Sequence, residues 1–124
     1  MDQKRVVIIV VAAAMLCSLS LTFAAETMAS FTQQPYVPSA CFDGTDKGTL
    51  IAGFGNSVWN RELCGQKLKV TCIDENSQKC KSSSVIVTLV DNCEDCVDSI
   101  TLSEEAFDVI ANKDAGSVKV EYVP

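Results

Sequence analysis

Histidine is absent from all 124 residues of this sequence. Histidine is the commonest general base near neutral pH and a frequent ligand of catalytic zinc, so its absence excludes Ser-His-Asp chemistry and most zinc hydrolase sites. Any acid-base catalysis must therefore use carboxylates. The sequence also lacks an Asn-X-Ser/Thr triplet, which predicts a chain without N-linked sugar.

Positive charge is scarce, since ten Lys and Arg face sixteen Asp and Glu, a net charge of −6. The first 24 residues contribute one net positive charge, so the remainder carries −7. Nucleic acids and anionic membranes bind proteins through Lys and Arg. The balance therefore predicts no nucleic-acid partner, and it argues weakly against acidic polysaccharide.

One long apolar run is present, and it lies near the N-terminus. Lys4 and Arg5 precede the apolar stretch 6–16, and small residues follow where signal peptidase cleaves. The run is too short for a confident transmembrane helix, and an uncleaved anchor is the alternative. We expect a signal peptide over residues 1–24 and one secreted, extracellular domain over residues 25–124, with no membrane insertion after cleavage.

Removal of the leader takes Cys17 with it and leaves an even number of cysteines in an oxidising compartment. These are Cys41, Cys64, Cys72, Cys80, Cys93 and Cys96. Three disulfides are the expected arrangement. A metal site is not expected, because zinc sites usually use histidine or paired C-x-x-C motifs and only one such motif is present.

The single C-x-x-C motif, Cys93 to Cys96, has a second interpretation as a redox pair. Glu94 and Asp95 lie between the two cysteines and Asp98 follows them. Nearby negative charge disfavours the thiolate that attacks in redox chemistry. We therefore expect a structural bridge.

Most of the periodic pattern beyond the leader has period two. Leu68, Val70 and Cys72 alternate with polar residues, and the alternation recurs over 118–122, so both stretches predict strands with one buried face. The apolar run 85–90 predicts a central strand covered on both sides.

One helix is expected between the last two strands. Ser103 is a favourable N-cap, and Glu104 and Glu105 follow at the positive end of the helix dipole, while 112–116 ends the helix. The remaining stretches have loop composition; they are 33–38, 43–48 and 73–84. Several short strands, one helix and bridged loops predict a mainly β fold, a small closed β-barrel.

Several short tracts occur in an order and spacing that is specific as a set. They are Pro35-Tyr36-Val37-Pro38-Ser39-Ala40-Cys41, Leu50-Ile51-Ala52 with Trp59, Cys64-Gly65 with Val70 and Cys72, Val90-Asp91 with Cys93, Leu102-Ser103 with Ala106-Phe107, Ile110-Ala111-Asn112 with Asp114-Ala115-Gly116, and Glu121-Tyr122. On these tracts the chain resembles the plant natriuretic peptide-like proteins, also called endoglucanase-45-like domain proteins, which are related to barwin and to the first domain of expansins. The resemblance implies a six-stranded double-psi β-barrel with one or two short helices, secreted to the plant cell wall space, the apoplast.

The resemblance also implies a pairing of the cysteines. Expansin-type pairing joins Cys41 to Cys64, Cys72 to Cys80 and Cys93 to Cys96, and the first two bonds close loops of moderate size around the strand at 68–72. A barwin-like bond between Cys64 and Cys93 is the main alternative.

Hydrolytic relatives carry a pair of acids in a groove across the barrel, and here the resemblance supplies only one. Asp91 matches an acidic position, while the second acid falls on Thr101, whose hydroxyl is too weak a proton donor to replace it. Asp98 is the nearest substitute. It lies three residues before Thr101, and an odd number of steps along an extended chain points the two side chains to opposite faces. An aromatic residue that usually lines the groove is replaced by Thr32, so glycan affinity and catalysis are both reduced. We expect no enzyme and no cofactor.

Three single residues have alternative roles. Tyr36, flanked by prolines in a loop, is the better candidate for an exposed recognition residue, although it could also only pack on its neighbours. For Trp59 we expect packing against the core rather than stacking on a sugar. Asp91 is either a remnant of the groove or a cap of the turn before Cys93. The resemblance implies a non-enzymatic signalling protein that acts in water and ion homeostasis through a cell-surface receptor, as a monomer. The alternative is an expansin-like protein that binds or loosens cell-wall polysaccharide.

Overall fold

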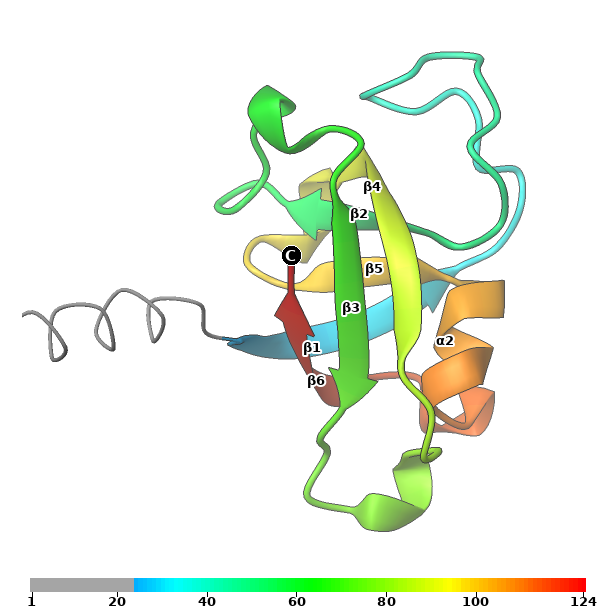
Figure 1. Cartoon of the computed structure of the whole chain (residues 1–124), viewed down its shortest axis with the longest axis vertical. Helices are drawn as coiled ribbons and strands as arrows, with labels where there is room; N and C mark the ends of the chain where they lie inside the picture. Colours follow the sequence, from blue (N-terminus) through cyan, green and yellow to red (C-terminus); the bar gives the residue numbers. More distant parts are fainter. Residues whose placement is uncertain (1–23) are drawn as a thin grey trace, which may run out of the picture.

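The computed structural model describes residues 24–124. The expected signal peptide and Cys17 lie outside the described residues. Six strands make up the fold: β1 (Ala25–Thr32), β2 (Ile51–Gly55), β3 (Lys67–Cys72), β4 (Val85–Cys93), β5 (Ile100–Ser103) and β6 (Val118–Val123). They close into a barrel in the order β1-β5-β2-β4-β3-β6, and β6 pairs again with β1 (Figure 1).

Two of the six strand pairs, β1 with β5 and β2 with β4, are parallel, and the other four are antiparallel. The predicted fold class is therefore confirmed, and the strand order is consistent with a double-psi barrel. One α-helix, α2 (Glu104–Ile110), is accompanied by four short 3₁₀ turns: η1 (Arg61–Leu63), η2 (Ser77–Lys79), η3 (Glu94–Cys96) and η4 (Lys113–Ala115). No helix among residues 24–124 has the length and apolar character needed to cross a membrane.

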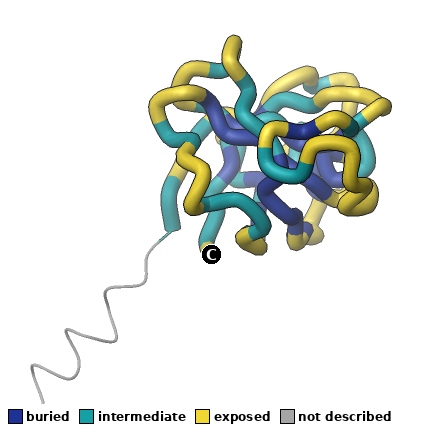
Figure 2. Tube along the Cα trace, turned by 90° about the horizontal axis from the view of Figure 1, so that it is seen from above, coloured by how far each residue is buried: buried dark blue, intermediate teal, exposed yellow. Residues whose placement is uncertain are grey.

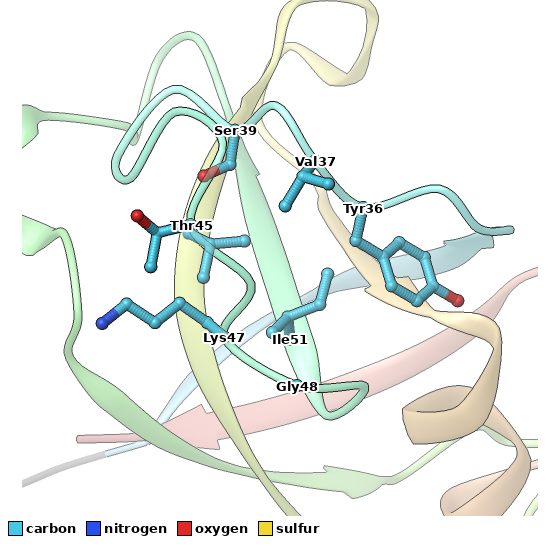
Figure 3. Close-up of a pocket in the computed structure, with 8 residues that line it drawn as sticks. Tyr36, Val37, Ser39, Thr45, Lys47, Gly48 and Ile51 are labelled. Atoms are coloured by element: carbon cyan, nitrogen blue, oxygen red, sulfur yellow. The ribbon is translucent and has the colours of Figure 1, made fainter.

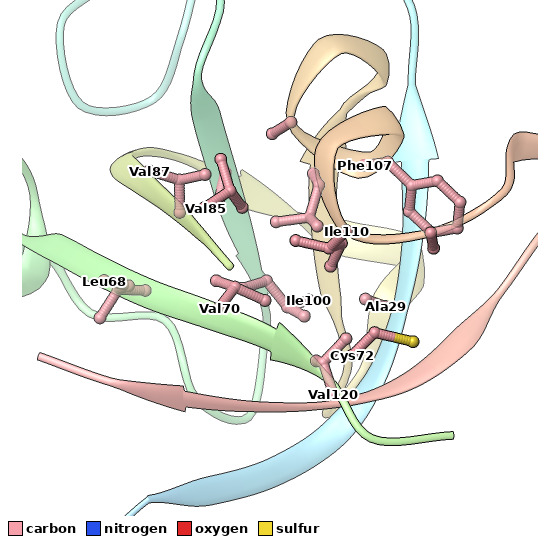
Figure 4. Close-up of a cluster of buried hydrophobic side chains, with 14 of the residues drawn as sticks. Ala29, Leu68, Val70, Cys72, Val85, Val87, Ile100, Phe107, Ile110 and Val120 are labelled. Atoms are coloured by element: carbon pink, nitrogen blue, oxygen red, sulfur yellow. The ribbon is translucent and has the colours of Figure 1, made fainter. Parts of the chain in front are cut away.

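The core fills the barrel and continues under α2. Leu89, Ile100 and Leu102 are fully buried inside the ring, and Phe107 and Ile110 reach the same core from the helix (Figure 4). Exposed residues gather instead in the connecting segments (Figure 2). Burial of apolar surface at roughly 25 cal/mol per Å² is the main stabilising contribution in a domain of this kind.

The sequence pattern identified the most regular elements. The strands β3 and β6 and the helix α2 are confirmed, and the Ser103 hydroxyl caps α2 by accepting a hydrogen bond from the Ala106 amide at 3.1 Å. The prediction for 85–90 was partly wrong. β4 is longer, reaching Cys93, and its outer face is open at Ile86, which is 53% exposed.

Three disulfides link the six described cysteines in the expansin-type arrangement. They join Cys41 to Cys64, Cys72 to Cys80 and Cys93 to Cys96, with Cα–Cα distances of 5.4, 5.5 and 5.3 Å. The barwin-like bond between Cys64 and Cys93 is not formed. The first bond secures the long segment 33–50, which extends above the barrel between β1 and β2 (Figure 1).

Candidate functional site

Four residues on neighbouring strands form a line across the outside of the barrel. In the strand register Asp91 of β4 pairs with Gly53 of β2, Gly53 pairs with Thr101 of β5, and Thr101 pairs with Ser30 of β1. The residues on either side of these positions along β1, β2 and β5 are Ala29, Ala52, Phe54, Ile100 and Leu102, which belong to the core. Since side chains alternate along a strand, Ser30, Gly53 and Thr101 lie on the outer face. Asp91 pairs with Gly53 beyond a register shift and accepts a hydrogen bond from the outer 33–50 segment, so all four positions lie on the outside of the barrel. We call them the cross-strand row.

The centre of the cross-strand row has no side chain. A Cβ atom at Gly53 would lie 3.1 Å from the Asp91 carbonyl oxygen and 3.2 Å from Thr101 Cγ2. The register between β2 and β4 also shifts at this point, between Ala52 and Gly53. Glycine therefore lets the three strands approach closely, and it places backbone without a side chain between one carboxylate and two hydroxyl groups.

The Asp91 carboxylate holds a turn of the 33–50 segment. Its Oδ1 atom accepts a hydrogen bond from the Ala40 amide at 2.9 Å, and the next amide, of Cys41, donates to the Val90 carbonyl at 2.9 Å. The proposed cap of a turn before Cys93 is not observed, because β4 continues through Asp91 to Cys93 and no turn lies there. Asp91 therefore caps a different turn, the one over 39–43.

Asp98 does not join Asp91 in the cross-strand row. It lines a shallow hollow with Glu26, Met28 and Lys119, at the side of the barrel formed by β1 and β6. Its backbone carbonyl accepts a hydrogen bond from the Thr27 hydroxyl at 3.0 Å. The row thus holds a single carboxylate, and Thr101, which the resemblance predicts at the position of the second acid, contributes a hydroxyl.

Tyr36 joins the 33–50 segment to the start of α2. Its hydroxyl donates to Glu105 Oε2 at 2.6 Å and accepts a hydrogen bond from the Glu104 amide at 3.2 Å. Burial, reinforced by the hydrogen bond with Glu105, raises the pKa of Tyr36 to about 12. The same hydrogen bond lowers the pKa of Glu105. The Tyr36 side chain points toward the helix (Figure 3) and is only partly exposed.

The 33–50 segment also covers apolar side chains on the outside of the barrel. Ile51 and Val90 face Val37 and Thr45 in a small hollow beneath the segment, with Lys47 at its edge (Figure 3). This cover explains why Ile51, although it precedes outward-facing Gly53 by two residues, is 5% exposed.

The other two candidate residues differ in exposure. Trp59 is partly buried against the core, and the Arg61 guanidinium lies 5.7 Å from the centre of its ring. Its indole N–H is buried and makes no hydrogen bond within residues 24–124. Thr32 is exposed at the end of β1. No group of three or more Asp, Glu or Cys side chains in the described part of the chain is arranged to hold a metal ion.

The closed six-stranded barrel defines the fold class of the protein. A family model described as "Lytic transglycolase" matches residues 51–122. Among solved structures, an expansin from Clavibacter michiganensis in complex with cellohexaose has a TM-score of 0.67 at 22% identity, covering 82% of this chain and 50% of the expansin. The Streptomyces papain inhibitor has a TM-score of 0.61 at 18% identity, covering 82% of this chain and 96% of the inhibitor. These two likenesses show the fold.

The particular family follows from closer relatives. An EG45-like domain containing protein of Citrus jambhiri is 39% identical over 93% of this chain and 93% of its own length. EG45-like domain containing protein 2 of Arabidopsis thaliana is 39% identical over 100% of this chain and 97% of its own length. The chain belongs to the EG45-like domain containing proteins. It spans half the length of the expansin, so the activity of a whole expansin is not transferred with the fold.

Sequence reasoning missed two members of the row, Ser30 and Gly53. The signal for Ser30 is its place as a polar residue between the apolar residues Ala29 and Phe31. Gly53 lies in a strand that the period-two pattern did not reveal, because all five residues of β2 are buried.

Proposed function

We propose that residues 25–124, released by removal of the leader 1–24, act in the apoplast as a non-enzymatic signalling protein. It acts in water and ion homeostasis through a cell-surface receptor. One observation carries the proposal: the only carboxylate of the cross-strand row, Asp91, holds the turn over 39–43. Asp91 matches a position at which hydrolytic relatives carry a catalytic acid, but here its carboxylate bonds to a surface segment.

The row does not have the chemistry of glycoside hydrolysis. An inverting glycosidase needs two carboxyl groups about 6.5–9.5 Å apart, one to protonate the leaving oxygen and one to activate water. Asp91 has no partner acid in the row. Thr101 carries only a hydroxyl group, and Asp98 lines the hollow at the side of the barrel formed by β1 and β6. Inverting hydrolysis of a glycosidic bond therefore lacks one of its two groups.

Recognition is better suited to the 33–50 segment. It is tied to the barrel by the Cys41–Cys64 disulfide, by Asp91 and by Tyr36. A surface held at several points loses little conformational freedom on binding, which favours affinity. We assign receptor contact to this segment and to the adjoining residues up to Trp59.

Wall-stripped protoplasts provide the test, because a protein that acts on the wall has no substrate there. Purified mature protein should change the rate of protoplast swelling at nanomolar to micromolar concentration. Asp91→Ala should reduce the effect by releasing the turn over 39–43, whereas Asp91→Asn keeps an oxygen that accepts from the Ala40 amide and should retain it. The absence of any effect of the native protein on protoplasts would refute the signalling proposal.

A second candidate function is binding of cell-wall polysaccharide without hydrolysis. It is supported by the likeness in fold to an expansin solved in complex with cellohexaose. Sedimentation with insoluble cellulose and pectin tests it directly. Retention of the native protein, with loss of retention in a variant carrying a bulky side chain at Ser30, would favour this function.

A further inference from the structure

The 33–50 segment contains a short stretch that the barrel does not hold. Every residue of 43–50 is exposed. Among residues 24–124, the backbone of 44–48 makes hydrogen bonds only to residues two or three positions earlier, from the Thr45 amide at 3.0 Å and from the Gly48 amide at 2.7 Å. We call residues 44–48 the open loop.

The contacts that hold the segment lie on both sides of the open loop. Before it, the chain is fixed at Cys41 by a disulfide. After it, the Thr49 carbonyl accepts a hydrogen bond from the Ser103 hydroxyl, and the Leu50 carbonyl accepts one from the Thr88 amide at 3.0 Å. The open loop can therefore change conformation while the barrel stays intact, which is the property that makes a surface loop a substrate for proteases.

The open loop carries one basic side chain, Lys47, which is the only Lys or Arg between residues 25 and 60. Its side chain extends away from Ile51, and its ammonium group lies 4.4 Å from the centre of the Phe42 ring, a weak contact at an exposed position (Figure 3). Gly48 follows with φ 88°. Glycine adopts extended backbone as readily as positive φ, so the chain at Lys47 and Gly48 can straighten into the cleft of a protease.

The other basic residues of the described chain are held more firmly. Lys81 is the next candidate, but its amide donates to the Ile110 carbonyl at 2.7 Å and its ammonium group pairs with Asp108 at 3.1 Å. The rest lie in strands or 3₁₀ turns; they are Arg61, Lys67, Lys69, Lys79, Lys113 and Lys119. An endopeptidase that cleaves after Lys or Arg therefore finds one weakly held peptide bond.

We propose that the peptide bond between Lys47 and Gly48 is a processing site for an extracellular endopeptidase, and that its cleavage ends the signal. The enzyme is of the kind whose specificity pocket holds a carboxylate, which pairs with the Lys47 ammonium group. Water adds across the bond and leaves a carboxylate on Lys47 and an ammonium group on Gly48. The effect on signalling rests on the proposed function, whereas the cleavage itself can be measured without it.

The cleaved protein should stay in one piece. Cys41 and Cys64 lie on opposite sides of the cut and are joined by a disulfide. β1 also keeps both of its neighbours, β5 and β6. The residues between Cys41 and Lys47, however, lose their connection to Thr49. A receptor must then order a free chain end on binding, which weakens its affinity for this surface.

The first test is limited digestion of the purified mature protein with trypsin under native conditions. The first product should be heavier by one water molecule before reduction, and reduction should separate it into residues 25–47 and 48–124. Lys47→Gln should be cut roughly tenfold more slowly, whereas the control Lys81→Gln should be cut as fast as the native protein. A first cut at any other Lys or Arg would overturn the inference.

The second test asks whether the site is used by a plant. The full chain is expressed in leaves, and the free amino groups of the protein in the extracellular fluid are labelled before analysis by mass spectrometry. A labelled N-terminus at Gly48 is expected for the native chain and should disappear in Lys47→Gln. If the native protein carries no such terminus, Lys47 is not a processing site.

The third test compares intact and trypsin-cut protein in the swelling of wall-stripped protoplasts. The cut protein should need about fivefold higher concentration for the same effect, because the freed residues must be ordered on binding. Lys47→Gln treated with trypsin should act like the intact native protein. Equal activity of the cut and intact forms would refute the signalling effect and leave the receptor proposal intact. If the intact protein has no effect, the proposed function fails, while the terminus at Gly48 still decides whether the site is cleaved.

Discussion

Replacement of Tyr36 by phenylalanine removes one hydroxyl from the connection between the 33–50 segment and α2. That hydroxyl donates to Glu105 at 2.6 Å and accepts from the Glu104 amide at 3.2 Å. A hydrogen bond contributes about 0.5–1.5 kcal/mol net to the free energy of unfolding, and more when one partner is charged. Because the Glu105 carboxylate is exposed to solvent, we expect a contribution near the middle of this range. We expect Tyr36→Phe to lower the free energy of unfolding by about 1 kcal/mol and the melting temperature by roughly 4–8 °C.

The loss of stability caused by Tyr36→Phe should become smaller at low pH. The hydrogen bond from Tyr36 lowers the pKa of Glu105 in the folded protein below its ordinary value of 4.5. A carboxyl with a lowered folded-state pKa stabilises the protein above its unfolded-state pKa and loses that contribution as pH falls through the folded-state pKa. The difference in stability between native protein and Tyr36→Phe should therefore be constant between pH 4.5 and pH 10.0 and should shrink below pH 4.5.

Thermal melting followed by circular dichroism across this pH range provides the measurement. Tyr122→Phe is the control, because burial alone raises the pKa of Tyr122 and its hydroxyl makes no side-chain hydrogen bond within residues 24–124. Glu105→Gln should lower the stability of the Tyr36→Phe variant by less than it lowers that of the native protein, because the two side chains share one hydrogen bond. Equal melting temperatures for Tyr36→Phe and native protein, or a difference that persists unchanged at low pH, would refute the reasoning.

Three further predictions concern the scaffold and the row. Replacing Cys41 and Cys64 by alanine should lower the free energy of unfolding by about 3 kcal/mol in a denaturant titration, because this bond closes the longest of the three loops; an unchanged midpoint would contradict this. Gly55→Ala should lower the melting temperature by several degrees because its Cβ would meet the Val97 carbonyl at 2.3 Å, whereas Gly44→Ala, with nothing within 4 Å, should melt like the native protein. The native protein should release no reducing ends from cellulose, xyloglucan, mixed-linkage glucan or peptidoglycan, and turnover abolished by Asp91→Asn would show that a second acid acts.

The elements that could be predicted from sequence are those whose pattern arises locally. β3 alternates between buried and exposed residues because only one of its faces meets the core, and Ser103 caps α2 through a contact three residues away. β2 gave no such pattern. Its five residues are all buried, because the 33–50 segment covers Ile51 and neighbouring backbone covers Gly53 and Gly55.

The candidate site was predictable only in part for a related reason. The resemblance to family tracts predicts Asp91 and Thr101 as counterparts of the two acids, and the strand register places both residues in the row. The hydrogen bond from the Ala40 amide to Asp91 spans 51 positions in the sequence, and the one from the Ser57 hydroxyl to the Val97 carbonyl spans 40. Contacts of this kind follow from the closed barrel and leave no local pattern.

The closed order of strands has a consequence for assembly of the chain. β6 pairs with β1 on one side and with β3 on the other, so the last strand of the chain closes the ring. All three disulfides lie between Cys41 and Cys96, and none reaches β1 or β6. A fully oxidised chain can therefore still be an open sheet, with unpaired backbone groups along β1 and β3 that invite pairing with another molecule. Deletion of β6 should produce such a state, soluble only at low concentration, with every disulfide in place.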